Sequence, residues 1–437
     1  MLSQTHKVKL GDAVHYKTVF ARYDNPRIHD LGPAWLFTNS DKGTFGCKRK
    51  FAWNNVECIS LPQKNEALNY GSAWHLWMEE VLAFIKEHDR VPSKKEHWGI
   101  FQEKIGQVLE EALVDFKQEA NFEKIKQGFY DRIYRSIEGW RLNWERQVHP
   151  KYKVLEIEMV VVAPIQGPDG GIFAPEMPIL TNHRTNPTTL RPPLVGEVKK
   201  NRLDGEWHDA VREFPWYKVG KIDVLLEHRA TGNLIILDHK TSSYPSSYES
   251  KFNFDMQMPS YAALLKWEIE HGDFYSQYRG KIIDGMVWDI CHSKIPAIPE
   301  PNKDGTLSVK KTCASWVYKM ALKKHQLEMT PEYEKFIQKA EKEHDKKYFV
   351  IVESFLTQNA IDRCRGEDLA QAYEMHRTLC SLYNMSPTDG TMFDVLAPRY
   401  PLCDKWGKCG ISNICFANYT PCAITNVRQP KLYWEAT

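Results

Sequence analysis

The stretch from Gly220 to Tyr261 constrains the fold of this chain more than any other. It reads GKIDVLLEHRATGNLIILDHKTSS and, after a short gap, QMPSY. The apolar runs VLL and LIIL predict two strands that are buried on both faces, at residues 222–227 and 234–240. The residues Thr-Gly-Asn at 231–233 favour a turn between them. The sequence therefore predicts a hairpin in the middle of a sheet.

This hairpin carries charged side chains at one end. Asp223 lies at the start of the first strand, Asp238 lies at the end of the second, and Lys240 follows two residues later. Because side chains alternate along a strand, Asp238 and Lys240 point to one side and His239 to the other. Two close carboxylates repel unless a cation lies between them, and Mg²⁺ or Mn²⁺ prefers oxygen ligands. The pattern predicts a metal site with a lysine that positions water; the alternative is a solvated strand end with a surface ion pair.

The order G-K-I-D, L-D-H-K-T and Q-M-P-S-Y resembles the PD-(D/E)xK nuclease superfamily, in its RecB-like branch. The resemblance implies metal-dependent hydrolysis of DNA phosphodiesters by an α/β protein with a restriction-endonuclease-like fold, a mixed central sheet flanked by helices. By motif match, Asp223 and Asp238 are metal ligands and Lys240 is the catalytic lysine. The backbone carbonyl of His239 then completes the metal shell.

Two helical segments extend the resemblance. Gln257 and Tyr261 lie four residues apart on one helical face, and the resemblance implies that they line the DNA path; the alternative is ordinary packing. The segment GSAWH, at 71–75, resembles the G-x-x-x-H element of the same branch. This implies that His75 is a further metal ligand, whereas a lone histidine on a helix is otherwise a polar surface side chain. Glu156 and Glu158, on the preceding predicted strand, are acidic neighbours without an assigned role.

Cysteines cluster near the end of the chain. Cys403, Cys409, Cys415 and Cys422 lack the paired C-x2-C spacing of most zinc sites, and their chemistry alone leaves zinc and an iron–sulfur cluster open. The resemblance to iron–sulfur nucleases of the AddB and CRISPR-associated type implies a structural [4Fe–4S] cluster, with zinc as the alternative. Its ligands would be Cys47 upstream and Cys403, Cys409 and Cys415 downstream, and Cys422 could replace one of them.

The overall charge gives little sign of a nucleic-acid partner. The net charge is only +2, so a DNA-binding surface must be local. Lys48 and Arg49, which lie among aromatic residues, could follow a single-stranded backbone; the alternative is the solvated first turn of a helix. The sequence has no apolar stretch of membrane-spanning length and no phosphate-binding loop, so we expect a cytoplasmic protein that does not use ATP.

The sequence divides into five regions around a predicted sheet of four or five strands. These are an N-terminal segment at 1–66, a helical region at 67–150, a nuclease core at 151–295 with an insertion at 164–215, a helical region at 296–394, and a cysteine-rich iron–sulfur segment at 395–437.

The function expected from these features is exonucleolytic cleavage of single-stranded DNA or of duplex ends. An endonuclease of the same chemistry, and a non-catalytic subunit that binds DNA ends or a protein, are the alternatives. A helicase, a recombination protein or a CRISPR-type protein is a candidate partner. Phage DNA metabolism is a plausible setting, which would place the protein in the host-cell cytoplasm.

Overall fold

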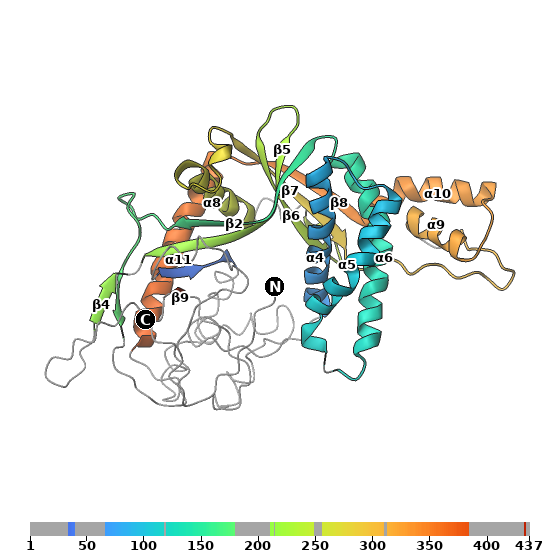
Figure 1. Ribbon diagram of the computed structural model, residues 1–437, viewed down its shortest axis with the longest axis horizontal. Helices are drawn as coiled ribbons and strands as arrows, with labels where there is room; N and C mark the ends of the chain where they lie inside the picture. Colours follow the sequence, from blue (N-terminus) through green and yellow to red (C-terminus); the bar gives the residue numbers. More distant parts are fainter. Residues whose placement is uncertain are drawn as a thin grey trace.

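A computed structural model shows a mixed α/β protein in which helices flank a mixed sheet (Figure 1). This confirms the predicted fold class and agrees with a restriction-endonuclease-like fold. The structure describes residues 34–39, 66–117, 119–179, 210–213, 215–248, 256–309, 313–383 and 432–433.

The central sheet has seven strands among the described residues, rather than the four or five predicted from sequence. Its order is β8-β7-β6-β5-β1-β9, and β2 pairs with β5 as well. The strands are β1 (Ala34–Phe37), β2 (Tyr152–Pro164), β5 (Trp216–His228), β6 (Leu234–Ser242), β7 (Ile283–His292), β8 (Phe349–Phe355) and β9 (Leu432–Tyr433). The β6–β7 and β1–β5 pairs are parallel, and the other pairs are antiparallel.

The predicted hairpin is present, and its strands separate where the charged residues lie. The β5–β6 pairing runs from Glu227 and Leu234 to Val224 and Leu237. Beyond that point β5 continues to its pairing with β1, whereas β6 continues beside β7. A fork therefore opens in the sheet.

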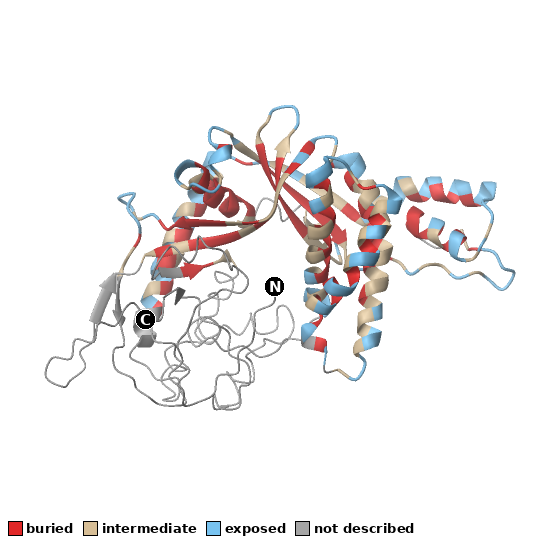
Figure 2. Cartoon of the chain, in the orientation of Figure 1, coloured by how far each residue is buried: buried red, intermediate tan, exposed pale blue. Residues whose placement is uncertain are grey.

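Three helices cover one face of the sheet: α4 (Glu66–His88), α5 (Lys94–Ala112) and α6 (Phe122–Gln147). Their apolar side chains recur at helical spacing, so α4 and α6 present an apolar face to the sheet and α5 packs against both of these helices. Figure 2 shows these inner faces as buried. The largest buried side chains of this layer are Trp74, Trp77, Trp140 and Trp144.

Two helices cover the other face: α8 (Gln257–His271) and α11 (Gln358–Tyr383). Gly220 of β5 permits the close approach of α8, because a Cβ atom at this position would lie 2.8 Å from the ring of Tyr261. The ammonium of Lys218, which is fully buried in β5, lies 2.7 Å from both carboxylate oxygens of Asp368 in α11. A charge-assisted contact therefore holds α11 against the sheet.

The remaining elements lie outside the central layers. Strands β3 (Glu176–Ile179) and β4 (Ala210–Glu213) form a separate antiparallel pair. Helices α9 (Ser315–Lys324) and α10 (Pro331–Glu343) follow β7 and precede β8 along the chain. Pro331 begins α10, a position where proline is favoured. The short 3₁₀ turns are η3 (Val114–Phe116), η5 (Ser276–Tyr278) and η6 (Asp345–Lys347). Within the described part of the chain, no helix combines the length and apolarity needed to cross a membrane.

Candidate active site

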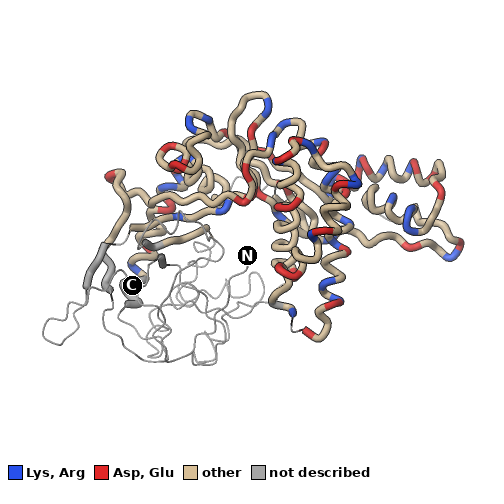
Figure 3. Tube along the Cα trace, viewed as in Figure 1, with Lys and Arg blue, Asp and Glu red and all other residues tan. Residues whose placement is uncertain are grey.

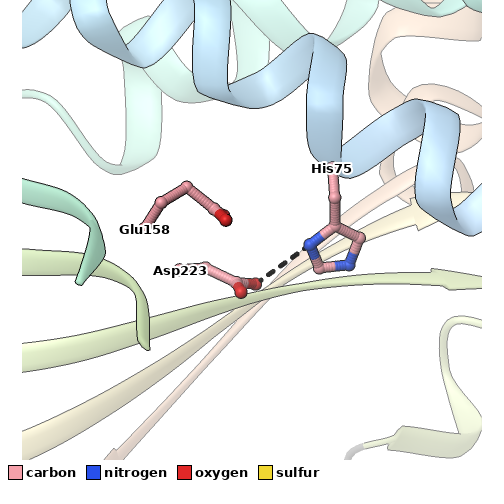
Figure 4. A group of neighbouring side chains, drawn as sticks. All are labelled: His75, Glu158 and Asp223. Carbon is pink, nitrogen blue, oxygen red and sulfur yellow. Dashed lines mark ion pairs between the residues drawn. The ribbon is translucent and has the colours of Figure 1, made fainter. Parts of the chain in front are cut away.

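Three potential metal ligands meet at the fork between β5 and β6. His75 extends from α4 towards Asp223 of β5, and Glu158 of β2 lies on the same side (Figure 4). One ligand atom from each residue lies within 4.8 Å of the other two. His75 Nδ1 is 3.3 Å from Asp223 Oδ2. The structure thus brings together two residues that were expected as ligands, His75 and Asp223, and one that had no assigned role, Glu158.

Glu158 has an unusual backbone conformation where it meets this group. Its φ angle is +50°, in the left-handed region that non-glycine residues seldom adopt. The register pairs Ile157 with Val224 and Met159 with Ile222, which places Glu158 opposite Asp223. Its carboxylate also forms an ion pair with Lys221. The feature of the sequence that could have identified Glu158 as a ligand is its position as an acidic residue on the strand preceding the hairpin.

Lys240 and Asp238 form a second group beside the first. Lys240 Nζ lies 2.5 Å from Asp238 Oδ2 and donates to Gln257 Oε1 at 3.1 Å. Gln257 Nε2 lies within hydrogen-bonding distance of Asp238 Oδ1 at 3.3 Å and of the Tyr261 hydroxyl at 2.9 Å. Tyr261 is buried against Gly220. Its ring therefore lies inside the protein rather than on an open surface, and its hydroxyl holds Gln257.

His239 lies between the fork and the core under α6. The β5–β6 backbone pairing ends before His239, and the backbone N–H of His239 donates instead to the side chain of Asp223, at Oδ2, at 2.8 Å. Its buried ring turns away from Asp238, as strand alternation predicts, and its Nδ1 lies 3.1 Å from Asp289 Oδ2. Trp140 Nε1 donates to the same oxygen at 2.7 Å. A buried chain of contacts therefore links α6 to the carboxylate of Asp223.

The two aspartates differ in protonation behaviour. Burial opposes ionisation of Asp223, but the adjacent His75, with smaller contributions from His239 and Lys240, outweighs burial and holds the pKa of this carboxyl well below its usual range. Burial also disfavours the charged form of His75, yet Asp223 raises its pKa. Burial raises the pKa of Asp238, with Lys240 opposing and Asp223 adding to the rise. Asp223 and His75 thus each favour the charged form of the other.

The donor set at the fork fits a hard divalent cation. Asp223 and Glu158 offer carboxylate oxygens, and His75 offers an imidazole nitrogen. Mg²⁺ and Mn²⁺ accept carboxylate oxygens and keep several waters, so a partial protein shell suffices. The carboxylates of this group also carry the negative charge that a cation would neutralise. Asp238 lies outside the group of three, although it is close enough to influence the pKa of His75.

Several predicted site residues lie outside the described residues. They are the predicted cluster ligands Cys47, Cys403, Cys409 and Cys415, the substitute Cys422, and the predicted DNA contacts Lys48 and Arg49. Along the described part of the chain, acidic and basic residues are interspersed (Figure 3).

An acidic group at a fork in a mixed sheet, next to a lysine held by a carboxylate, is the arrangement expected of a metal-dependent hydrolytic enzyme. The family model of the PD-(D/E)XK nuclease superfamily matches residues 45–415, and the chain belongs to this superfamily. No curated protein matches the chain. Membership implies a nuclease that acts on DNA and uses Mg²⁺ or Mn²⁺.

Proposed function

We propose that this nuclease is a RecB-like exonuclease that degrades single-stranded DNA or duplex ends. The observation that carries the proposal is the fork, where His75, Asp223, Asp238 and Lys240 converge from separate elements in the order of the RecB-like motifs. Gln257, from the helix that follows the catalytic lysine in that branch, bonds to Lys240.

In this proposal Asp223, Glu158 and His75 hold the metal, with Asp238 and the carbonyl of His239 completing the shell. A bound Mg²⁺ or Mn²⁺ supplies charge that polarises the phosphodiester and acidifies water. The ammonium of Lys240, fixed by Asp238 and Gln257, stabilises negative charge that develops on the phosphate and orients the attacking water.

The side chains of the Gln-x-x-x-Tyr helix have a supporting role in this mechanism. Gln257 bonds to both Lys240 and Asp238, and Tyr261 bonds to Gln257. Of the two, Gln257 is the one that we place along the DNA path, because Tyr261 is buried. Fixing the ammonium in advance reduces the reorganisation needed when the phosphate arrives.

The proposal includes a structural [4Fe–4S] cluster on Cys47, Cys403, Cys409 and Cys415, with zinc as the alternative metal. The family match starts two residues before Cys47 and ends at Cys415, so it includes all four cysteines. Protein purified without oxygen should be brown and contain about four iron atoms per chain. A colourless protein that contains zinc would overturn the cluster assignment.

The decisive test uses end-labelled single-stranded DNA, linear duplex and closed circles with Mg²⁺ or Mn²⁺. We expect the linear substrates to be degraded and the circles to survive, with Lys240→Ala slowing cleavage by roughly 100- to 1,000-fold. Lys153→Ala, an exposed lysine on β2, is the control and should behave as wild type. Activity that survives Lys240→Ala would contradict the mechanism.

The remaining outcomes distinguish the alternatives. Cleaved circles would indicate an endonuclease of the same chemistry. A folded wild type that binds DNA and metal without cutting would indicate a non-catalytic binding subunit. As part of the same proposal, the enzyme acts in the cytoplasm, that of the host cell if it is encoded by a phage, and a helicase, recombination or CRISPR-type protein supplies its substrate.

A further inference from the structure

A second polar feature lies at the edge of the sheet beyond the fork. It is a cavity of about 610 Å³ at the ends of β6 and β7 and the start of β8. We name it the edge pocket. Its lining includes Ser243 and Val350, which locate it on the sheet, and Tyr244, Lys346 and Lys347, which carry the argument.

The strand register places the edge pocket near the proposed catalytic lysine. Lys240 of β6 pairs with Ile290 of β7, and Ile290 pairs with Val350 of β8, which lines the pocket. Neighbouring strands lie about 4.8 Å apart, so Val350 is roughly 10 Å from Lys240 across the sheet. The strand that carries Lys240 also leads directly into the lining residue Ser243. A short stretch of nucleic acid can span this distance.

The pocket offers positive charge that the described protein does not neutralise. Lys346 and Lys347 are both exposed, and neither has a carboxylate within ion-pairing distance among the described residues. The adjacent Asp345 instead accepts hydrogen bonds from the backbone N–H of Ser315 at 2.8 Å and from its hydroxyl at 2.5 Å. Two unpaired ammonium groups at one rim are suited to phosphate.

The pocket also offers an exposed aromatic ring on which an unpaired base can stack. The side chain of Tyr244 is 76% exposed, an unusual position for a large aromatic ring. Its backbone is fixed, because the Tyr244 N–H donates to Ser242 Oγ at 3.0 Å and its carbonyl accepts from Ser247 Oγ at 2.8 Å. Exposed aromatic rings stack on unpaired bases, whereas the bases of a duplex are already stacked on one another.

We propose that the edge pocket binds an unpaired segment of the substrate DNA strand next to the cleavage site. Lys346 and Lys347 contact its phosphates, and Tyr244 stacks on a base. This inference rests on the proposed function, since it names the form of DNA that the same site accepts. It predicts that a frayed or single-stranded end, rather than intact duplex, enters the fork.

The charge contribution is tested by anisotropy of a labelled oligodeoxythymidylate without added divalent metal, so that binding is measured apart from cleavage. Lys346→Ala/Lys347→Ala should weaken binding about tenfold. It should also reduce the slope of log K against log salt by about 1.4, the value for two phosphate contacts on a single strand. Lys335→Ala/Lys342→Ala on α10 removes the same charge elsewhere and is the matched control. Equal losses in both double variants would overturn the pocket as the binding site.

The aromatic contribution is tested separately. Tyr244→Ala should weaken single-strand binding about tenfold, whereas Tyr244→Phe should bind as wild type, because the ring remains. Binding of a blunt-ended duplex should change little in either variant. A larger loss for duplex than for single strand would overturn the assignment to unpaired DNA.

Cleavage measurements then separate this inference from the proposed function. If the wild type cuts DNA, the pocket variants should raise KM while leaving kcat within about twofold, the pattern of lost ground-state binding. If the wild type binds single strands through these residues but does not cut DNA, the proposed function is wrong and the assignment of the pocket is kept. If the wild type cuts DNA and all pocket variants bind single strands as the wild type does, the assignment of the pocket alone is wrong.

Discussion

Glu158 and Glu156 lie two residues apart on β2, yet they have different surroundings. Glu156 pairs with Lys86 at 2.5 Å and accepts from the Tyr278 hydroxyl at 2.8 Å. Glu158, with its positive φ, joins His75 and Asp223. A left-handed non-glycine residue costs about 1–3 kcal/mol, so the surrounding structure must hold it in place. Such outliers cluster at functional sites.

We therefore expect Glu158→Gln to weaken Mn²⁺ binding by roughly tenfold or more, because it removes a charged oxygen ligand. Glu156→Gln is the matched control and should bind Mn²⁺ nearly as the wild type does. Calorimetric titration of both variants with Mn²⁺ measures the effect directly. Equal affinities in the two variants would remove Glu158 from the metal shell.

Asp289 is expected to act on the metal site through His239. Its carboxylate lies between Trp140 Nε1 and His239 Nδ1, and the His239 N–H bonds to Asp223. Asp289→Asn keeps the volume and an acceptor for Trp140 but loses the charge facing the imidazole. The orientation of His239 should loosen, and the Mn²⁺ affinity should fall several-fold, an effect typical of residues that orient metal ligands.

The control for Asp289→Asn is Cys291→Ala, a buried substitution two residues further along the same strand. It should lower the melting temperature without changing the Mn²⁺ affinity. If both variants lose affinity in proportion to their loss of stability, then Asp289 has only a packing role.

The residues of the hairpin were predictable because strand alternation and motif spacing are local. Asp238, Lys240 and His239 take the sides of β6 that a period of two requires. The role of Glu158 was not predictable, since strand alternation does not distinguish it from Glu156 two residues away. The contact between Trp140 and Asp289 spans 149 residues of sequence, and no local pattern carries such information.

At the level of elements, α6 packs tightly through one glycine. A Cβ atom at Gly139 would lie 2.5 Å from the ring of Trp316 and 2.6 Å from that of Phe349. Gly128, on the same helix, has open space around the corresponding position. Alanine substitutions at the two positions therefore distinguish the effect of helix propensity on stability from the effect of packing.

Gly139→Ala should destabilise the protein by about 1–3 kcal/mol, because the extra methyl group overpacks the contact with α9 and β8. Gly128→Ala should stabilise it by up to about 1 kcal/mol, because alanine favours the helix. Urea denaturation of both variants measures the difference. A stabilising Gly139→Ala would show that this helix is less tightly packed than the structure indicates.

Element boundaries were predictable where the chain itself marks them. The turn at Gly232 was expected from the sequence; Pro331 begins α10, and α5 begins at Lys94. Ser93 and Glu96 form a capping box that could have located this start. The short strands β1 and β9 are held by pairing with distant partners, which a local pattern cannot reveal.

At the scale of the whole molecule, His97 makes stability depend on pH. It is buried against Trp77, with a ring-centroid distance of 5.6 Å, and burial lowers its pKa from 6.5 to about 3. Above pH 6.5 the imidazole is neutral in both the folded and the unfolded protein, so it contributes no pH dependence. Below pH 6.5 the unfolded chain takes up a proton that the folded protein excludes, and stability falls with decreasing pH.

We expect the free energy of unfolding to lose up to about 1.4 kcal/mol per pH unit from this histidine between pH 6.5 and 3. His97→Phe should flatten that part of the profile, whatever its effect on stability at pH 7. His271→Gln, at an exposed position on α8, should keep the wild-type slope. Chemical denaturation at a series of pH values gives the comparison, and identical slopes for all three proteins would contradict the assignment.

The contact between Lys218 and Asp368 determines how small a working version of this enzyme can be. A fragment ending before α11 would retain the whole fork, but it would lose Asp368, the carboxylate that faces the ammonium of Lys218, together with the rest of α11. Removing one partner of a buried pair costs about 3–5 kcal/mol, a large share of the stability of a typical domain. Any minimal nuclease cut from this chain must therefore extend beyond Asp368, more than a hundred residues past the last catalytic side chain.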